Sequence, residues 1–144
     1  MPVGDRQDPY RVYNFRVEID GMTRAGFREC SGLDSSTDSI DYREGTDPIT
    51  ARKLPGLVKH SNITLKWGIT DDAEFWEWRK KAIEGKVERK NGSIVLMSDA
   101  GEEKIRWNFR EGWPTKWSGP GFNATGNEVA IETLEIVHEG VTRA

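Results

Sequence analysis

The sequence has little of the residues that most often carry chemistry. It holds one cysteine, Cys30, and two histidines, His60 and His138, among 144 residues. A single cysteine excludes an internal disulfide. The two histidines stand far apart, and neither belongs to a cluster with ligand spacing, so no metal site is predicted. We expect Cys30 to be a small, at least half-buried thiol and both histidines to be surface or interface groups.

Signatures of catalysis and of cofactor binding are also missing. There is no Gly-x-Ser-x-Gly elbow for a nucleophilic serine. The glycines at 119, 121 and 126 do not match a phosphate-binding loop, and Pro120 lacks a donor that such a loop would use. Asp71 and Asp72 are better explained as helix-start residues than as an acid–base pair. We therefore predict no catalytic residue, no cofactor, and a protein that is not an enzyme.

Long apolar runs are absent as well. The longest one, Ile94-Val95-Leu96-Met97, is far shorter than a membrane span. The first ten residues include acidic groups and no apolar segment, so we expect neither a signal peptide nor membrane insertion. A formal net charge of −3 argues against a protein that holds nucleic acid by its phosphates.

Alternation of apolar and polar residues is frequent and predicts a mainly β chain. Ile40 and Tyr42 are expected to point inward, and the last strand is expected to be central because it is apolar on both faces. Asn91-Gly92 is either a hairpin turn or a bulge. The predicted strands are 13–19, 22–31 with a possible bulge at Gly26, 37–44, 61–69, 87–90, 93–98, 103–111 and 128–139.

One segment changes to helical spacing. Residues 72–84 place Phe75, Trp78, Ala82 and Ile83 along one side, with charged residues on the other and Gly85 after the end. Residues 113–127 are predicted to be a loop. The fold class is mainly β with one helix (α+β): two packed antiparallel sheets form a barrel-like single domain, 1–144, with a flanking helix and a flexible tail at 1–11.

Six tryptophans and five phenylalanines are many for this length. Trp107, Phe109, Trp113 and Trp117 are interleaved with cations, a pattern that single-stranded nucleic-acid binders use. Alternation instead favours Trp107 and Phe109 in the core. A small β-barrel that binds a small ligand or single-stranded nucleic acid remains the alternative function.

A long connector separates the strand that ends at Glu44 from the strand that begins at Ser61. Residues 44–60 show no clean period and contain two prolines and two glycines. Most hairpin connections use two to five residues. A connector of this length in a small β domain is either functional or disordered.

Several segments, read in order, carry a resemblance to a known family. They are Asn14-Phe-Arg-Val-Glu-Ile-Asp-Gly, Tyr42-Arg-Glu-Gly-Thr-Asp-Pro, Lys53-Leu-Pro-Gly-Leu, Asn62-Ile-Thr-Leu-Lys-Trp-Gly, Trp76-Glu-Trp-Arg-Lys, Arg89-Lys-Asn-Gly-Ser, Trp107-Asn-Phe-Arg-Glu-Gly-Trp-Pro and Asn127-Glu-Val-Ala-Ile-Glu. No single motif is diagnostic, but the ordered set spans almost the whole chain. Together the segments resemble the tail tube proteins of contractile phage tails and of phage-tail-like contractile injection systems.

The resemblance implies a structural role. Members form hexameric rings that stack into a hollow tube inside a contractile sheath, which drives the tube and its spike through a target envelope. The implied partners are further copies of the chain, sheath, baseplate and spike proteins, and effector or DNA cargo in the lumen. Assembly would take place in the bacterial cytoplasm.

The resemblance also gives the long connector a role. In the family the corresponding loop reaches neighbouring subunits and the adjacent ring. Here apolar side chains would anchor it and charged ones would set its register. The implied assembly residues of the extended loop 44–60 are Glu44, Asp47, Ile49, Arg52, Lys53, Leu54, Pro55 and Leu57.

Overall fold

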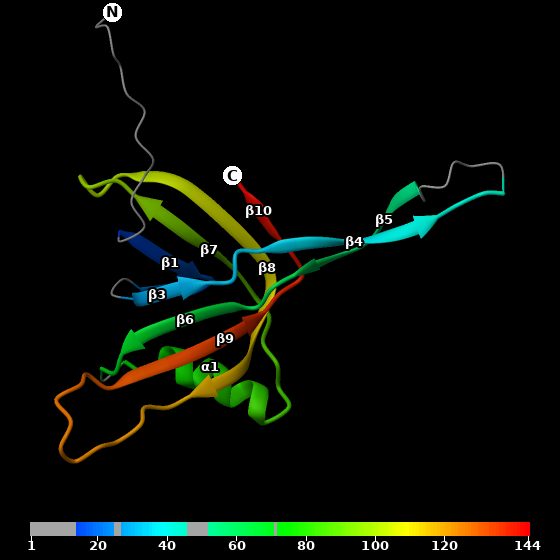
Figure 1. Ribbon diagram of the computed structural model, residues 1–144. Helices are drawn as coiled ribbons and strands as arrows, with labels where there is room; N and C mark the ends of the chain where they lie inside the picture. The colour runs from blue at the N-terminus through cyan, green and yellow to red at the C-terminus, as the bar shows by residue number, and fades with distance from the viewer. Residues whose placement is uncertain (1–13, 25–26, 46–51, 71) are drawn as a thin grey trace, which may run out of the picture.

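The computed structural model describes residues 14–24, 27–45, 52–70 and 72–144. The predicted tail at 1–11, the bulge at Gly26 and the helix-start residue Asp71 lie outside these ranges. The described residues form ten strands and one helix (Figure 1). These are β1 (Phe15–Ile19), β2 (Met22–Arg24), β3 (Phe27–Ser31), β4 (Ser35–Tyr42), β5 (Arg52–His60), β6 (Ile63–Gly68), α1 (Glu74–Ile83), β7 (Lys90–Met97), β8 (Glu103–Ser118), β9 (Ile131–Val137) and β10 (Val141–Arg143).

Two antiparallel sheets make the body, and one long strand belongs to both. The strand order is β2-β1-β7-β8-β9-β6-β3, with β10 paired to β8 beside this path. The first part of β8 pairs with β7 and β10, and its last residues pair with β9. The sheets do not close into a barrel. This confirms the α+β class with two packed sheets and one helix.

Strand β8 is longer than the sequence predicted. Residues 113–118, expected to be loop, continue the strand and pair with β9 from Trp113↔Val137 to Ser118↔Thr133. Glu111 has a positive φ of 54°. The pairing with β9 also shifts register between Pro114 and Lys116. These two irregularities break the period of two, so alternation alone could not reveal the second half of the strand.

The other strands of the body differ from the prediction in several places, and residues 87–89 and 128–130 are not part of a strand. The expected strand 22–31 is divided between the sheets, because β2 pairs with β1 whereas β3 pairs with β6. Asn91-Gly92 lies within the single strand β7, where the register shifts, so the bulge and not the hairpin is correct. Strand β9 is central, as predicted, and the short strand β10 follows it.

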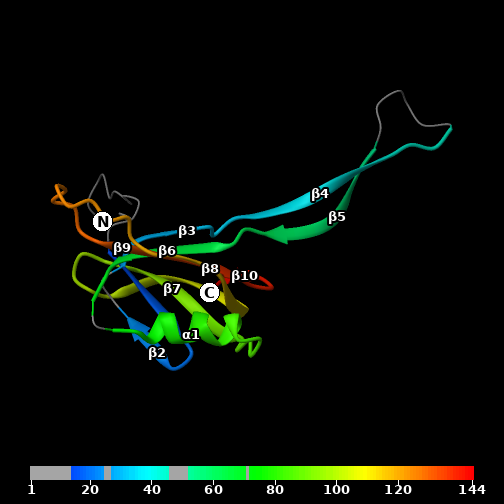
Figure 2. The same ribbon diagram turned by 90° about the horizontal axis from the view of Figure 1, so that it is seen from below.

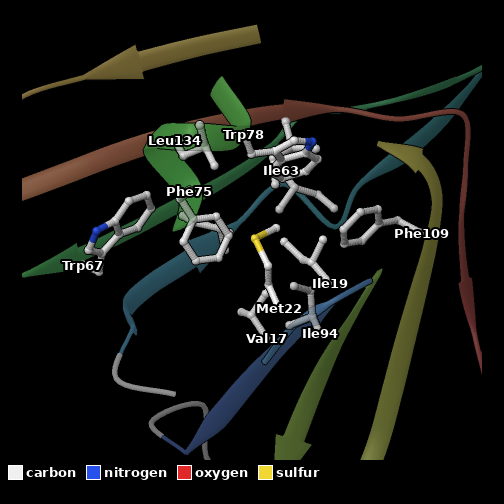
Figure 3. Packing of buried hydrophobic residues seen from close by; sticks show 12 residues of the cluster. Val17, Ile19, Met22, Ile63, Trp67, Phe75, Trp78, Ile94, Phe109 and Leu134 are labelled. Atoms are coloured by element: carbon white, nitrogen blue, oxygen red, sulfur yellow. The ribbon is translucent and has the colours of Figure 1, made fainter. Parts of the chain in front are cut away.

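The core lies between the two sheets and the helix (Figure 3). Ile63, Leu65, Leu134 and Ile136 are completely buried on β6 and β9. The opposite side of the core is formed by strand residues, and helix α1 adds two aromatic side chains. The strand residues are Val17, Ile19, Met22, Ile94 and Phe109, and the helix residues are Phe75 and Trp78. Phe109 is 3% exposed, as predicted for a core residue. Trp107 is only half-buried and lies outside this cluster, so its assignment to the core was wrong.

Helix α1 covers one end of the body (Figure 2). The amide of Glu74 donates a hydrogen bond to the Asp72 carboxylate, 3.0 Å away. The indole of Trp78 donates to the carbonyl oxygen of Glu88 at 2.7 Å, and the Arg79 guanidinium donates to that of Pro114 at 3.3 Å. Phe75 and Trp78 are buried, as the helical spacing predicts, whereas Ile83 is exposed. No helix in the described ranges is long and apolar enough to cross a membrane.

Candidate functional site

Strands β4 and β5 form a two-stranded arm that projects away from the body (Figures 1 and 2). Every residue of β4 is exposed. Strand β5 is exposed except at Gly56 and His60. The arm corrects the sequence prediction twice: residues 52–60 of the expected loop are a strand, and Ile40 and Tyr42 do not point into a core.

Cross-strand pairing fixes the arm internally. Ile40 lies opposite Leu54, Asp41 opposite Lys53 and Tyr42 opposite Arg52. Lys53 forms an ion pair with Asp41, and the Lys59 ammonium lies 3.2 Å from the Asp38 carboxylate. Exposed ion pairs contribute little stability. Their arrangement does specify one register, because a slip of one residue would separate both pairs.

Apolar side chains concentrate on the arm with nothing in the described chain to cover them. Leu57 is 72% exposed, Val58 61% and Ile40 52%, and Tyr42 and Leu54 exceed 40%. Single exposed apolar residues are ordinary, but a group of them on a thin ribbon indicates a surface for a partner. Both strands also present an outer edge, which a further strand could pair with.

The sequence-predicted assembly residues occupy different places on the arm. Glu44 follows β4 and accepts a hydrogen bond from the Tyr42 hydroxyl at 2.7 Å, which raises the pKa of Tyr42. Arg52, Lys53, Leu54, Pro55 and Leu57 all lie on β5. Asp47 and Ile49 lie outside the described residues. The sequence reasoning missed Ile40 and Tyr42, whose alternation within a strand it took for an inward face, and Val58, which it placed in the long connector.

The arm joins the body at a set of close contacts, the arm root, made of Asp34, His60, Ser61, His138 and Gly140. The Ser61 amide donates to the carbonyl oxygen of Asp34 at 3.1 Å. The carbonyl oxygen of Ser61 lies 2.8 Å from Nε2 of His138. Ser61 therefore connects the residue before β4 to the residue after β9.

Two other features bear on alternative functions. An open groove of about 590 Å³ is lined by Arg106, Arg110, Glu18 and Glu139 among other residues, so its charge is mixed. Trp117 packs against Trp67 and Trp76 with ring centroids 5.5 and 5.3 Å apart. These three indoles therefore pack against one another. Within the described ranges, no three His, Cys, Asp or Glu side chains gather where they could hold a metal ion.

The sequence matches a family model, the T4-like virus tail tube protein gp19, over residues 11–142. The chain belongs to this family. Membership confirms the resemblance drawn from the sequence motifs, and it makes the chain a tail tube protein with a structural, tube-forming role. No curated protein sequence matches the chain significantly.

Solved structures agree with this membership. A chain of the sheath–tube complex of an extracellular contractile injection system, PVC, in its extended state is 33% identical, with a TM-score of 0.86, and the match covers 94% of this chain and 91% of that one. A chain of the tube-terminating cap of the anti-feeding prophage is 32% identical, with a TM-score of 0.85 and coverage of 100% and 99%. Hcp1 from Flavobacterium johnsoniae, 18% identical at a TM-score of 0.56 with coverage of 90% and 93%, shares the fold.

Proposed function

We propose that this tail tube protein assembles into hexameric rings that stack into the inner tube of a contractile injection system or phage tail, and that the β4–β5 arm makes the contacts between copies. The observation that carries the proposal is the arm itself, a largely exposed ribbon with exposed apolar side chains and two open strand edges. A closed ring needs heterologous contacts, in which one surface of a subunit meets a different surface of the next.

The arm suits such a contact because it differs from the rest of the surface. Leu57, Val58 and Ile40 can become buried anchors, while the Asp41–Lys53 and Asp38–Lys59 pairs keep the ribbon in register. Arm side chains that are exposed in a single copy would become ordered when a neighbouring copy packs on them. The exposed edges would then be consumed by pairing around the ring and not by uncontrolled aggregation.

Further partners follow from the family and its relatives. A relative with 33% identity belongs to a sheath–tube complex, and another to a sheath/tube terminator, so a sheath protein and a terminator are the proposed neighbours of this tube. Baseplate and spike proteins, and effector or DNA cargo in the lumen, complete the proposed device. The chain itself is proposed to have no enzymatic activity and to assemble in the bacterial cytoplasm before the particle acts.

A shortened arm tests the proposal. Thr37 and Val58 are directly paired, so residues 38–57 can be replaced by an Asn-Gly turn that closes the hairpin at this pair. We expect the variant to fold, because the core cluster contains no arm residue. We also expect it to form no tubes. Circular dichroism measures folding, and negative-stain electron microscopy and light scattering measure assembly.

A pair of matched substitutions separates the arm from general surface effects. Leu57 on the arm is 72% exposed and Ile83 on the helix 58% exposed, so aspartate at either position should leave the fold intact. Leu57→Asp should prevent tube formation and Ile83→Asp should not. Normal tubes from both the shortened arm and Leu57→Asp would overturn the proposed role of the arm. A persistently monomeric wild-type chain that binds a small ligand or an oligonucleotide would instead support the alternative function.

A further inference from the structure

The hydrogen bonds of His138 at the arm root define its protonation state. The amide of Gly140 donates to Nδ1 of His138 at 3.1 Å, so Nδ1 carries no proton. The proton must then reside on Nε2, which donates to the carbonyl oxygen of Ser61 at 2.8 Å. Both hydrogen bonds are satisfied only by this neutral tautomer, because a protonated Nδ1 would face the N–H of Gly140 donor to donor.

His60 makes a second proton at this place unfavourable. Its ring centroid lies 5.6 Å from that of His138. Nδ1 of His60 is buried and has no hydrogen-bond partner among the described residues. A charge on the His138 ring would lie beside the His60 ring in a partly buried environment, where an ionised group loses hydration.

Charged groups from every neighbouring element surround the pair. On β8, the Nε atom of Arg110 lies 3.5 Å from the position that a Cβ atom would take on Gly140, and Nε2 of His60 lies 3.7 Å from the same point. Glu139 borders both the groove at His60 and a smaller hollow at His138. Glu111 of β8 and Arg89, just before β7, also line that hollow. Glu18, Asp20 and Arg106 line the groove beside His60, so charges of both signs border the pair.

We propose that His138, with His60 beside it, is a pH-sensitive latch that holds the arm root to the body at neutral pH and releases it in mildly acidic solution. Protonation of Nδ1 breaks the hydrogen bond from Gly140. It also places a positive charge beside His60 in a partly buried environment, and both effects favour a released, hydrated ring over the latched one, although the hydrogen bond to Ser61 opposes them. A tube subunit would then assemble readily near neutral pH and lose its preformed arm geometry in acid.

The direction of the effect follows from linkage. Burial lowers the pKa of His138, and the neighbouring His60 adds to this, while the hydrogen bond to Ser61 opposes it. In the released state His138 has the ordinary pKa of about 6.5. Above that pH both states are neutral and the latch is fully effective. As the pH falls below it, the released state takes up the proton first, so the latch weakens by up to about tenfold per pH unit until His138 also titrates in the latched state.

Hydrogen–deuterium exchange of the full chain tests the latch. Unassembled protein is isolated by size exclusion, and exchange is followed at pH 7.5 and pH 5.0 in peptides that contain Ser61 and Gly140. Protection factors are corrected for the intrinsic pH dependence of amide exchange. We expect protection at these two amides to fall several-fold in acid, while the core strands β6 and β9 keep theirs.

A matched variant isolates His138. His138→Gln retains an amide donor for Ser61 but does not titrate, so its protection at Ser61 should be the same at both pH values. His60→Gln should keep most of the pH dependence, because His138 still titrates. If His138→Gln does not fold, the wild-type His138 ring is followed by NMR. A measured pKa of His138 at or above 6.5, together with amide signals of Ser61 and Gly140 that do not change with pH, would overturn the proposed latch.

The outcomes also separate the latch from the proposed function of the arm. The latch itself does not depend on that function; only its expected effect on tube formation does. Protection that does not depend on pH overturns the latch, whether or not tubes form. Protection that depends on pH in a chain that never forms tubes supports the latch and overturns the proposed function. Tubes that form at pH 7.5 and fail at pH 5.0 in the wild type, yet form at both in His138→Gln, support both.

Discussion

Gly32 and Asn62 approach each other so closely that no side chain fits between their backbones. A Cβ atom on Gly32 would overlap the carbonyl oxygen of Asn62 and lie 2.9 Å from its carbonyl carbon. Gly32 also has a φ of +98°, which glycine adopts without a steric penalty. This contact lies where the chain leaves β3 for the arm and where it returns toward β6, so the arm root depends on it.

Gly32→Ala should therefore destabilise the protein strongly. The expected loss in the free energy of unfolding is about 3 kcal/mol, from backbone strain together with displacement of the Asn62 carbonyl. Gly21→Ala is the matched control, because Gly21 has a φ of +77° but nothing within 4 Å of an added Cβ. It should cost only about 1 kcal/mol. Urea unfolding measures both, and equal losses would show that the contact with Asn62 relaxes freely.

Phe109 and Trp107 lie on one strand but should differ in what their removal costs. Phe109 is 3% exposed within the core cluster, so Phe109→Ala should reduce the free energy of unfolding by about 3–5 kcal/mol. Trp107 is half-buried outside that cluster, and Trp107→Ala should cost roughly 1–2 kcal/mol. Thermal or chemical unfolding of the two variants checks the order. A larger loss from Trp107→Ala would place its indole in the core after all.

Cys30 should be an unreactive thiol in the folded protein. Burial, with a smaller effect of Glu29, raises the pKa of Cys30 to about 12. Since the thiolate is the reactive form, alkylation at pH 8 should be more than about a hundredfold slower than in the chain unfolded by guanidinium. Mass spectrometry after iodoacetamide treatment measures both rates. Comparable rates in the two states would mean that β3 opens readily in solution.

The sequence predicted the elements that alternate regularly and bury one face. Strands β1 and β6 and the buried residues Phe75 and Trp78 of α1 were predicted because their side chains repeat at the period of the structure they form. The second half of β8 was not, because Glu111 and the register shift at Pro114 interrupt that period. Periodicity within one strand contains no information about such irregularities.

The arm shows a different limit. Ile40 and Tyr42 alternate with polar residues as in a half-buried strand, and a single chain offers only its own core as the reason for that pattern. In the structure no part of the described chain covers them. The arm root could not be predicted from the sequence, for another reason. His60 and His138 meet only because β6 pairs with β9. This pairing brings together positions 77 residues apart, such as Ser61 and His138.

Strand β8 has a mechanical consequence. Its sixteen residues run from one sheet into the other without a turn, so the two sheets share a continuous covalent segment. A force applied to one sheet is therefore transmitted to the other along the polypeptide backbone. This transmission does not depend on the side chains packed between the sheets. Sliding the sheets apart along this strand would shear many hydrogen bonds at once and could not unzip them singly.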